Sequence, residues 1–281
     1  MRIGLHVSIA GNISESLGRA KGLGCNTMQI FSRNPRGWQV SPIAGSESAA
    51  FRSEKKALDI TPVVVHIPYI INLATPDPAL YKRSIEAYVE DLRRADELGA
   101  EYFVTHLGSH VGSGEKAGIE RFIKGLNTII RKADVSTMIL LETTAGSGSS
   151  LGSRFEEIGQ MIRGLDRPER CGVCVDTAHI FASGYELRTE KGFKKTMKEL
   201  DSSIGTDKVK VIHFNDSKAE FGSKVDRHEH LGKGKIGLPG LARVINHKGF
   251  RDCAFIMETP KEDDSDDKKN MKIARKMCGD I

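Results

Sequence analysis

The stretch KVIHFNDSKAEFGSKVDRHEHLGKGKIG, residues 210–237, carries the most informative pattern in the chain. Its first residues belong to an apolar run, residues 209–214, which is typical of a buried strand and contains His213. A polar loop then places Asp226, His228 and His230 within five positions. In an extended segment Asp226 and His228 point the same way, and zinc binds through imidazole nitrogen and carboxylate oxygen. A solvated loop of charges accounts for the same residues, so this stretch alone leaves both interpretations open.

The apolar run at 209–214 is one of eight strand-like runs that alternate with helix-like segments. The expected strands are residues 2–7, 26–31, 62–67, 101–106, 137–142, 171–176, 209–214 and 253–258. The expected helices are residues 12–23, 47–58, 78–98, 115–132, 153–163, 190–200, 238–246 and 267–278. The strands are continuous apolar runs, as is typical of strands buried on both faces.

This alternation predicts an α/β fold of the TIM (β/α)8 barrel class in a single domain, residues 1–281. A doubly wound open sheet is the structural alternative. It is disfavoured because no glycine-rich fingerprint follows the first strand.

Composition limits the functional class. The chain has 281 residues, 39% of them hydrophobic and 28% charged, which is typical of a soluble globular protein. No apolar run approaches the roughly 18 residues that span a membrane, and no signal peptide is recognised, so a cytoplasmic location is expected. The net charge of +5 permits a nucleic-acid partner without requiring one.

The cysteines do not suggest a disulfide framework, because there are five of them at irregular spacing. Cys171 and Cys174 form a C-G-V-C motif that fits a redox or zinc site. In a strand, however, side chains three positions apart face opposite sides. We therefore expect core cysteines in a reducing compartment.

Polar residues stand at the carboxyl ends of six predicted strands. They are His66, His106, Glu142, Asp176, His213 and Glu258, and His179 follows Asp176 by three positions. In a barrel these ends converge on the face where enzymes place their chemistry. Each residue alone has an ordinary explanation, such as a core histidine, an ion-pair partner or a helix cap. Together with Asp226 and His228 they number nine, and so many clustered carboxylates repel one another unless cations are present.

Nine ligating groups exceed what one ion uses, because zinc takes about four ligands. We therefore expect two or three divalent ions. Ions held about 4 Å apart activate water and stabilise a leaving oxygen, and this ligand set is most typical of phosphoester hydrolysis. A zinc protease is not indicated, because the sequence has no H-E-x-x-H motif.

Longer motifs carry a family resemblance. They are GLHVSIAGNI (4–13), FSRNPRGW (31–38), HIPYIINLA (66–74), THLGSH (105–110), LLETTAGSGSSLG (140–152), GVCVDTAHIFASGYELRT (172–189) and IMETP (256–260). With these motifs and the 210–237 stretch, the chain resembles the endonuclease IV family of apurinic/apyrimidinic (AP) endonucleases from residue 4 to residue 260. The resemblance implies a xylose-isomerase-like TIM barrel with three zinc ions at the carboxyl face of its strands.

The resemblance also implies which residues hold each ion. His66 and His106 would bind the first zinc, and Glu142 would bridge it to the second. Asp176, His213 and Glu258 would complete the second site. His179, Asp226 and His228 would hold the third. Manganese or iron can replace zinc at one position.

The implied activity is hydrolysis of the phosphodiester bond 5′ to an abasic site in double-stranded DNA by zinc-activated water. It leaves a 3′-hydroxyl and a 5′-deoxyribose phosphate, and the family also removes blocking groups from 3′ ends. Glu142 is the expected catalytic residue, and the protein is expected to be a monomer. A divalent-metal sugar isomerase or epimerase on the same barrel, and a non-catalytic protein that binds abasic DNA, are the alternatives.

Two loops are expected to contact DNA. Arg36 and Trp38 follow the second strand, and Tyr69 and Ile70 follow the third. Arginine binds phosphate or enters a minor groove, and an aromatic ring fills a gap in a base stack. A loop in which Trp38 merely anchors to the barrel is the alternative. Two further polar residues have lesser expected roles: His6 would donate to a metal ligand, and Asn215 would lie near a phosphate or serve as a cap.

Overall fold

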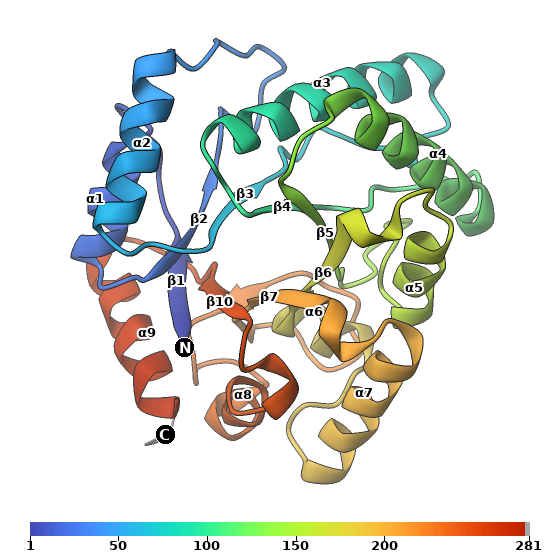
Figure 1. The fold of residues 1–281 in the computed structure, drawn as a ribbon. Helices are drawn as coiled ribbons and strands as arrows, with labels where there is room; N and C mark the ends of the chain where they lie inside the picture. Colours follow the sequence, from blue (N-terminus) through green and yellow to red (C-terminus); the bar gives the residue numbers. More distant parts are fainter. Residues whose placement is uncertain (279–281) are drawn as a thin grey trace.

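The structure, a computed structural model, describes residues 1–278. Eight parallel strands close into a barrel, and Figure 1 shows them at the centre of the molecule with the helices around them. The strands are β1 (Arg2–His6), β2 (Thr27–Phe31), β3 (Val63–His66), β4 (Tyr102–Thr105), β5 (Met138–Glu142), β6 (Cys171–Asp176), β7 (Val209–His213) and β10 (Ala254–Met257). They are ordered as in the sequence, and β10 closes the barrel against β1. The predicted TIM barrel is confirmed, and the open doubly wound sheet is excluded.

The outer layer consists of helices that follow the strands. They are α1 (Glu15–Gly22), α2 (Gly45–Ala57), α3 (Pro78–Glu97), α4 (Glu115–Ala133), α5 (Phe155–Arg163), α7 (Glu190–Ser203), α8 (Gly237–Ile245) and α9 (Asp264–Met277). Each coincides with a predicted helix and differs only at its ends. Helix α3 begins where Asp77 accepts hydrogen bonds from the backbone of Ala79 and Leu80, with Pro78 as the first helical residue.

Three regular elements were not predicted. Helix α6 (Thr177–Ser183) starts directly after β6, where the Asp176 side chain accepts a hydrogen bond from the backbone N–H of His179. Strands β8 (Asp216–Ser217) and β9 (His228–Glu229) pair antiparallel. Three short 3-10 turns, η1 (Pro168–Arg170), η2 (Thr206–Lys208) and η3 (Lys248–Phe250), precede or follow barrel elements.

The barrel interior is a separate small apolar core. Its buried residues are Val64, Val104, Leu140, Cys174, Val211, Ala254 and Ile256. The opposite faces of the same strands pack against the helices, and Cys171 belongs to that outer core. The expectation that Cys171 and Cys174 face opposite sides is therefore confirmed. All five cysteines lie within the described residues and are free thiols.

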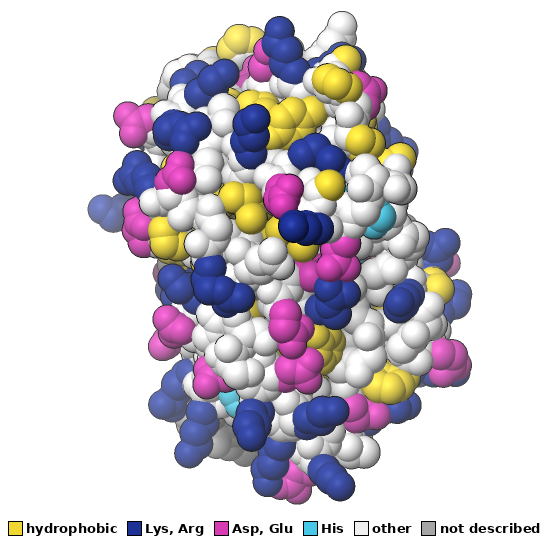
Figure 2. Space-filling model, turned by 90° about the vertical axis from the view of Figure 1, so that its right-hand side faces the viewer, with side chains coloured by type: hydrophobic (Ala, Val, Ile, Leu, Met, Phe, Trp, Pro, Cys, Tyr) yellow, Lys and Arg dark blue, Asp and Glu magenta, His cyan; other side chains and the backbone are white. Residues whose placement is uncertain are grey.

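The outer helical surface is charged. Figure 2 shows that Lys and Arg side chains are interspersed with Asp and Glu over the side of the barrel that carries α4 and α5. Within residues 1–278, no helix combines the length and the apolar character that crossing a membrane would require.

The close approach of β1 to β2 depends on a glycine. Gly4 is buried and pairs with Thr27, and a Cβ atom at Gly4 would lie 1.9 Å from the Thr27 carbonyl oxygen. That contact involves backbone on both strands, so no side-chain rotation relieves it.

We expect Gly4→Ala to lower the free energy of unfolding by roughly 3 kcal/mol or more, because it overpacks backbone against backbone. Gly18→Ala is the matched control, since Gly18 lies on the exposed side of α1 with open space at its Cβ. That change should raise stability by about 0.5–1 kcal/mol through helix propensity. Urea unfolding measures both, and equal small effects would contradict the proposed role of Gly4.

Candidate metal centre

The alternation of side chains along the strands brings six predicted ligands to one place. Each stands two positions beyond an interior residue of its strand, and successive side chains of a strand alternate between its two faces. The pairs are Val64 and His66, Val104 and His106, Leu140 and Glu142, Cys174 and Asp176, Val211 and His213, and Ile256 and Glu258. The six polar side chains therefore form a layer that caps the interior core at its carboxyl end.

Three groups in this layer have the spacing of metal ligands. In each group, one potential ligand atom per residue lies within 4.8 Å of all the others. The groups are His66, His106 and Glu142; then Glu142, Asp176, His213 and Glu258; then Asp176, His179 and His228. Glu142 and Asp176 each belong to two groups, so the three groups form one continuous centre.

The ninth predicted residue, Asp226, completes the third group from the solvent side. Its Oδ2 lies 3.1 Å from His179 Nε2, and its Oδ1 lies 3.5 Å from His228 Nε2. The structure therefore brings all nine predicted residues together. His230, two positions beyond His228, lies outside these groups and accepts a hydrogen bond from Asn270 of α9 at 3.0 Å.

Backbone carbonyls orient three of the histidines. Nδ1 of His66, His179 and His228 lies 2.8, 2.8 and 3.1 Å from the carbonyl oxygens of Ile67, Thr143 and Glu258, respectively. A carbonyl can only accept, so each Nδ1 carries the proton and each Nε2 faces the centre. Metal-binding histidines are held in this way, because the donated N–H fixes the ring and its tautomer.

Distances within the centre fit ligands that share an ion. His66 Nε2 and His106 Nε2 each lie 3.3 Å from Glu142 Oε2, and His228 Nε2 lies 3.4 Å from Asp176 Oδ2. Two ligands about 2.0–2.1 Å from one tetrahedral zinc are about 3.3 Å apart. His179 Nε2 and His228 Nε2 are buried and make no hydrogen bond to any described residue. The residues therefore fit divalent ions better than they fit a purely ion-paired cluster.

The charges of the centre favour cations. Burial lowers the pKa of His179, but Asp176 and Asp226 outweigh it and raise that pKa to about 10. Burial likewise opposes protonation of His228, whose pKa Asp176 raises to about 9. His106 faces less carboxylate, so burial prevails and its pKa falls to about 4. The part of the centre that contains Asp176 thus attracts positive charge most strongly.

Three residues support the ligands from behind, and one of them, Gln29, was not recognised in the sequence. Asn215 is fully buried, donates to Asp176 Oδ2 at 2.8 Å and accepts from the Glu258 backbone at 2.8 Å. It therefore supports two ligands, a role that the expectations for Asn215 did not include. His6 lies behind Glu258, with Nδ1 3.3 Å from Oε1, but that nitrogen accepts from Gln29 Nε2 at 3.0 Å. The donor to Glu258 Oε1 is therefore Gln29, at 2.5 Å, and not His6 as expected.

Asp216 organises the loop that follows the Asp226–His228 segment. Its buried carboxylate accepts backbone hydrogen bonds from Ser217, Gly232, Gly234, Ile236 and Gly237 at 2.8–3.3 Å. At Gly234 a Cβ atom would lie 2.4 Å from the Ser217 carbonyl oxygen, so the loop can wrap this closely only with glycine there. The pattern that could have predicted this loop is an aspartate just after an apolar strand, followed by the closely spaced glycines Gly232, Gly234 and Gly237.

Two cavities open onto the centre, and Tyr69 and Asp226 line both of them. One measures about 330 Å³ and also includes His106, Ser109 and His179. The other measures about 480 Å³ and is also lined by His6, His228 and Glu258. Tyr69 is 61% exposed, and its ring stacks on that of His106 with centroids 5.8 Å apart. The exposed ring thus stands between two spaces beside the centre.

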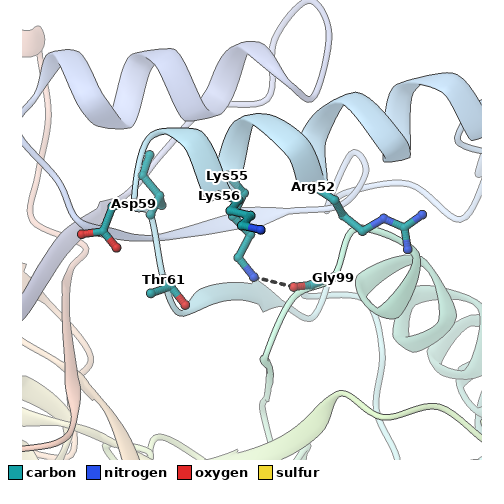
Figure 3. A pocket seen from close by; sticks show the side chains of 7 residues that line it. Arg52, Lys55, Lys56, Asp59, Thr61 and Gly99 are labelled. Carbon is teal, nitrogen blue, oxygen red and sulfur yellow. Dashed lines mark hydrogen bonds between the residues drawn. The ribbon is translucent and has the colours of Figure 1, made fainter.

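A third cavity lies away from this chemistry. Figure 3 shows it between α2 and the loops that precede β3 and β4, at the amino ends of the strands. Lys55 lines it, but Lys55 Nζ is already bonded to the Gly99 carbonyl at 2.6 Å and to Glu101 at 2.5 Å. Lys55 is therefore not free to bind a ligand in this cavity.

The loop predicted to contact DNA is fixed to α3. Buried Arg33 forms a bidentate pair with Asp91 at 2.6 and 2.8 Å and also donates to the Gly37 carbonyl. The Arg83 guanidinium lies 4.2 Å from the centre of the Trp38 ring. Trp38 and Ile70 are half-buried against the core, whereas Arg36 is exposed. The anchoring expected as an alternative for Trp38 is thus observed, and Arg36 and Tyr69 are left free to contact a ligand.

Comparisons with known proteins agree with this architecture. A family model described as a xylose isomerase-like TIM barrel matches residues 17–278. The chain is 43% identical to the probable endonuclease 4 of Methanoculleus marisnigri over 278 residues, 99% of each chain. The structure of endonuclease IV from Thermus thermophilus superimposes with a TM-score of 0.89 at 35% identity, over 99% of this chain and 98% of that one. A D-tagatose 3-epimerase-like protein superimposes with a TM-score of 0.76 at 18% identity over 99% and 97%, a likeness of fold alone.

The Arg33–Asp91 pair generates a stability prediction. We expect Asp91→Asn to cost about 3–5 kcal/mol, because it leaves a buried guanidinium without its countercharge. Asp166→Asn is the control, since the Arg131–Asp166 pair is 61% exposed on both sides and should contribute less than about 1 kcal/mol. Urea unfolding of both variants gives the comparison, and equal costs would show that Asp91 does not hold the loop.

Proposed function

The chain belongs to the endonuclease IV family, and we propose that it hydrolyses the phosphodiester bond 5′ to an abasic site in double-stranded DNA. The products would be a 3′-hydroxyl and a 5′-deoxyribose phosphate, and the same site would remove blocking groups from 3′ ends. The observation that carries this proposal is the continuous set of histidine and carboxylate ligands that opens onto two cavities. The 43% identity to a probable endonuclease 4 supports it over nearly the full chain.

In this proposal the nine residues hold three zinc ions, with manganese or iron as an alternative at one position. His66 and His106 belong to the first site, Asp176, His213 and Glu258 to the second, and His179, Asp226 and His228 to the third. Bound divalent ions supply an activated water and stabilise the charge that develops on the phosphate. The nitrogen and oxygen donors, the 3.3–3.4 Å spacings and the two buried imidazole nitrogens that make no hydrogen bond to a described residue support this assignment.

Glu142 is the proposed catalytic residue because its two oxygens face different groups. Oε2 lies 3.3 Å from both His66 Nε2 and His106 Nε2, whereas Oε1 lies 2.8 Å from His213 Nδ1. A carboxylate in this position links the first two sites and can accept a proton from the attacking water. Burial raises the pKa of Glu142, but His213 and His66 outweigh it and hold the pKa well below its usual range. The side chain is therefore ionised, as a carboxylate that binds divalent ions must be.

The two loops that follow β2 and β3 carry the proposed DNA contacts, with Arg36 and Tyr69 exposed and Trp38 and Ile70 half-buried behind them. Tyr69 with Ile70, and Arg36 with Trp38, would enter the duplex at the lesion, where a missing base leaves space for a ring. The sugar-phosphate at the abasic position would then turn into a cavity beside the centre, at a low cost because no base has to be unpaired. The position of Tyr69 between the two cavities supports this arrangement.

We expect Glu142→Gln to lower incision by roughly 10²–10⁴-fold, the range associated with loss of general acid–base catalysis. The assay is cleavage of a labelled duplex that contains one tetrahydrofuran abasic analogue, with bound metal counted by elemental analysis. Glu156→Gln is the matched control, because Glu156 is exposed on α5, outside the centre. It should leave incision unchanged.

An intact duplex with a fully metal-loaded wild type would overturn the proposed function. Ketose–aldose exchange or epimerisation on free sugars would then be the activity to assay. Binding of the abasic duplex without cleavage would instead indicate a recognition protein.

A second prediction concerns Arg36. If this exposed arginine contacts a phosphate, Arg36→Ala should weaken binding of the abasic duplex and reduce the slope of log K against log salt by about one. Bound metal should remain at the wild-type level, because Arg36 lies outside the centre. Fluorescence anisotropy over a salt series measures the slope, and an unchanged slope would remove Arg36 from the contacts.

A further inference from the structure

Gln29 of β2 lies behind the centre, and no role was predicted for it. The side chain is fully buried and makes three polar contacts. Its Oε1 lies 2.8 Å from His213 Nε2, and its Nε2 lies 2.5 Å from Glu258 Oε1 and 3.0 Å from His6 Nδ1. Two of these partners belong to the same ligand group, which also contains Glu142 and Asp176.

The chemistry of the amide determines what each partner does. An amide oxygen only accepts, so His213 Nε2 must carry a proton and Nδ1 is the nitrogen that faces Glu142 and Glu258. An amide NH2 only donates, so Glu258 Oε1 and His6 Nδ1 are acceptors. The reverse orientation would set the amide oxygen against an ionised carboxylate with no proton between them. The network therefore admits one orientation of Gln29.

Each contact leaves a specific atom free. Because Oε1 of Glu258 is engaged by Gln29, Oε2 is the oxygen that approaches His213 Nδ1, at 3.5 Å. Because Nε2 of His213 is engaged, the ring cannot turn to present that nitrogen to the centre. Gln29 is thus the common partner that selects one atom from each of two ligands, which lie on β7 and at the end of β10.

We propose that Gln29 is a positioning residue for the second ion, which sets the tautomer of His213 and the free oxygen of Glu258. This proposal rests on the proposed function, because it assumes that the group binds a divalent ion. It goes beyond that function by assigning control of one ion to a residue that is not a ligand. Partners of this kind contribute about 10–100-fold to metal affinity.

The ordinary alternative is that Gln29 only satisfies buried polar groups and so stabilises the barrel. The two roles differ in what they affect. A structural role lowers the stability of the metal-free protein and leaves zinc affinity unchanged. A positioning role lowers the affinity of one ion, and excess zinc restores the activity that was lost.

The test is Gln29→Met, which keeps the length of the side chain and removes both hydrogen-bonding groups. Thr27→Val is the matched control, because Thr27 is fully buried on the same strand and bonds to the Pro62 carbonyl, away from the centre. Competition with a zinc chelator measures affinity, elemental analysis counts the ions that survive dialysis, and thermal unfolding of the metal-free proteins measures stability.

For Gln29→Met we expect a 10–100-fold loss of affinity confined to about one ion per chain, with abasic-duplex incision recovered in excess zinc. Thr27→Val should retain every ion. If Gln29→Met does not fold, Gln29→Asn is the second variant, because it keeps the amide but shortens it by one methylene and so should show the same loss. Unchanged zinc affinity in a folded variant would overturn this proposal alone. A wild type that binds no zinc would overturn the proposed function as well.

Discussion

The central constraint is the concentration of carboxylate at one end of the barrel. Glu142 and Asp176 are buried, Glu258 is half-buried, and Asp226 approaches them from the loop. Such a group is strongly unfavourable unless positive charge accompanies it. The histidines beside these carboxylates, the carbonyls that orient the histidines and the residues behind them are all explained by that requirement. A cation is therefore as necessary to this end of the barrel as apolar packing is to its interior.

The barrel geometry explains why polar residues at the carboxyl ends of the strands come together as one site. Interior residues such as Val64 and Leu140 alternate with outward residues, and the next inward position of each strand falls at the carboxyl end, where the interior meets solvent. Replacing an apolar residue at that position with histidine or carboxylate leaves the packing below it intact. The pairing of β10 with β1 completes the ring, so ligands from strands far apart in sequence become neighbours.

Sequence alone predicted the barrel and the nine residues of the centre because both depend on local patterns: apolar runs, and the polar residues at their ends. It did not reveal helix α6, because seven residues are too few to show a helical periodicity. It also did not reveal the pairing of β8 with β9, because strands of two residues have no recognisable alternation. Gln29 was missed because one polar residue within an apolar strand gives no hint of its partners, which lie 184 and 229 positions away. Asn215 was expected beside a phosphate or as a cap, and its actual partners were missed because they are tertiary contacts, 39 and 43 positions away.

Asp176 illustrates how few amino acids such a centre can accept. One oxygen caps α6 through the backbone of His179, and the other receives the Asn215 amide and lies 3.4 Å from His228 Nε2. Asparagine would retain the cap but lose the negative charge. Glutamate would retain the charge but, being one methylene longer, would displace the cap and with it the helix that carries His179. The backbone cap and the negative charge of the centre thus favour aspartate independently over both asparagine and glutamate.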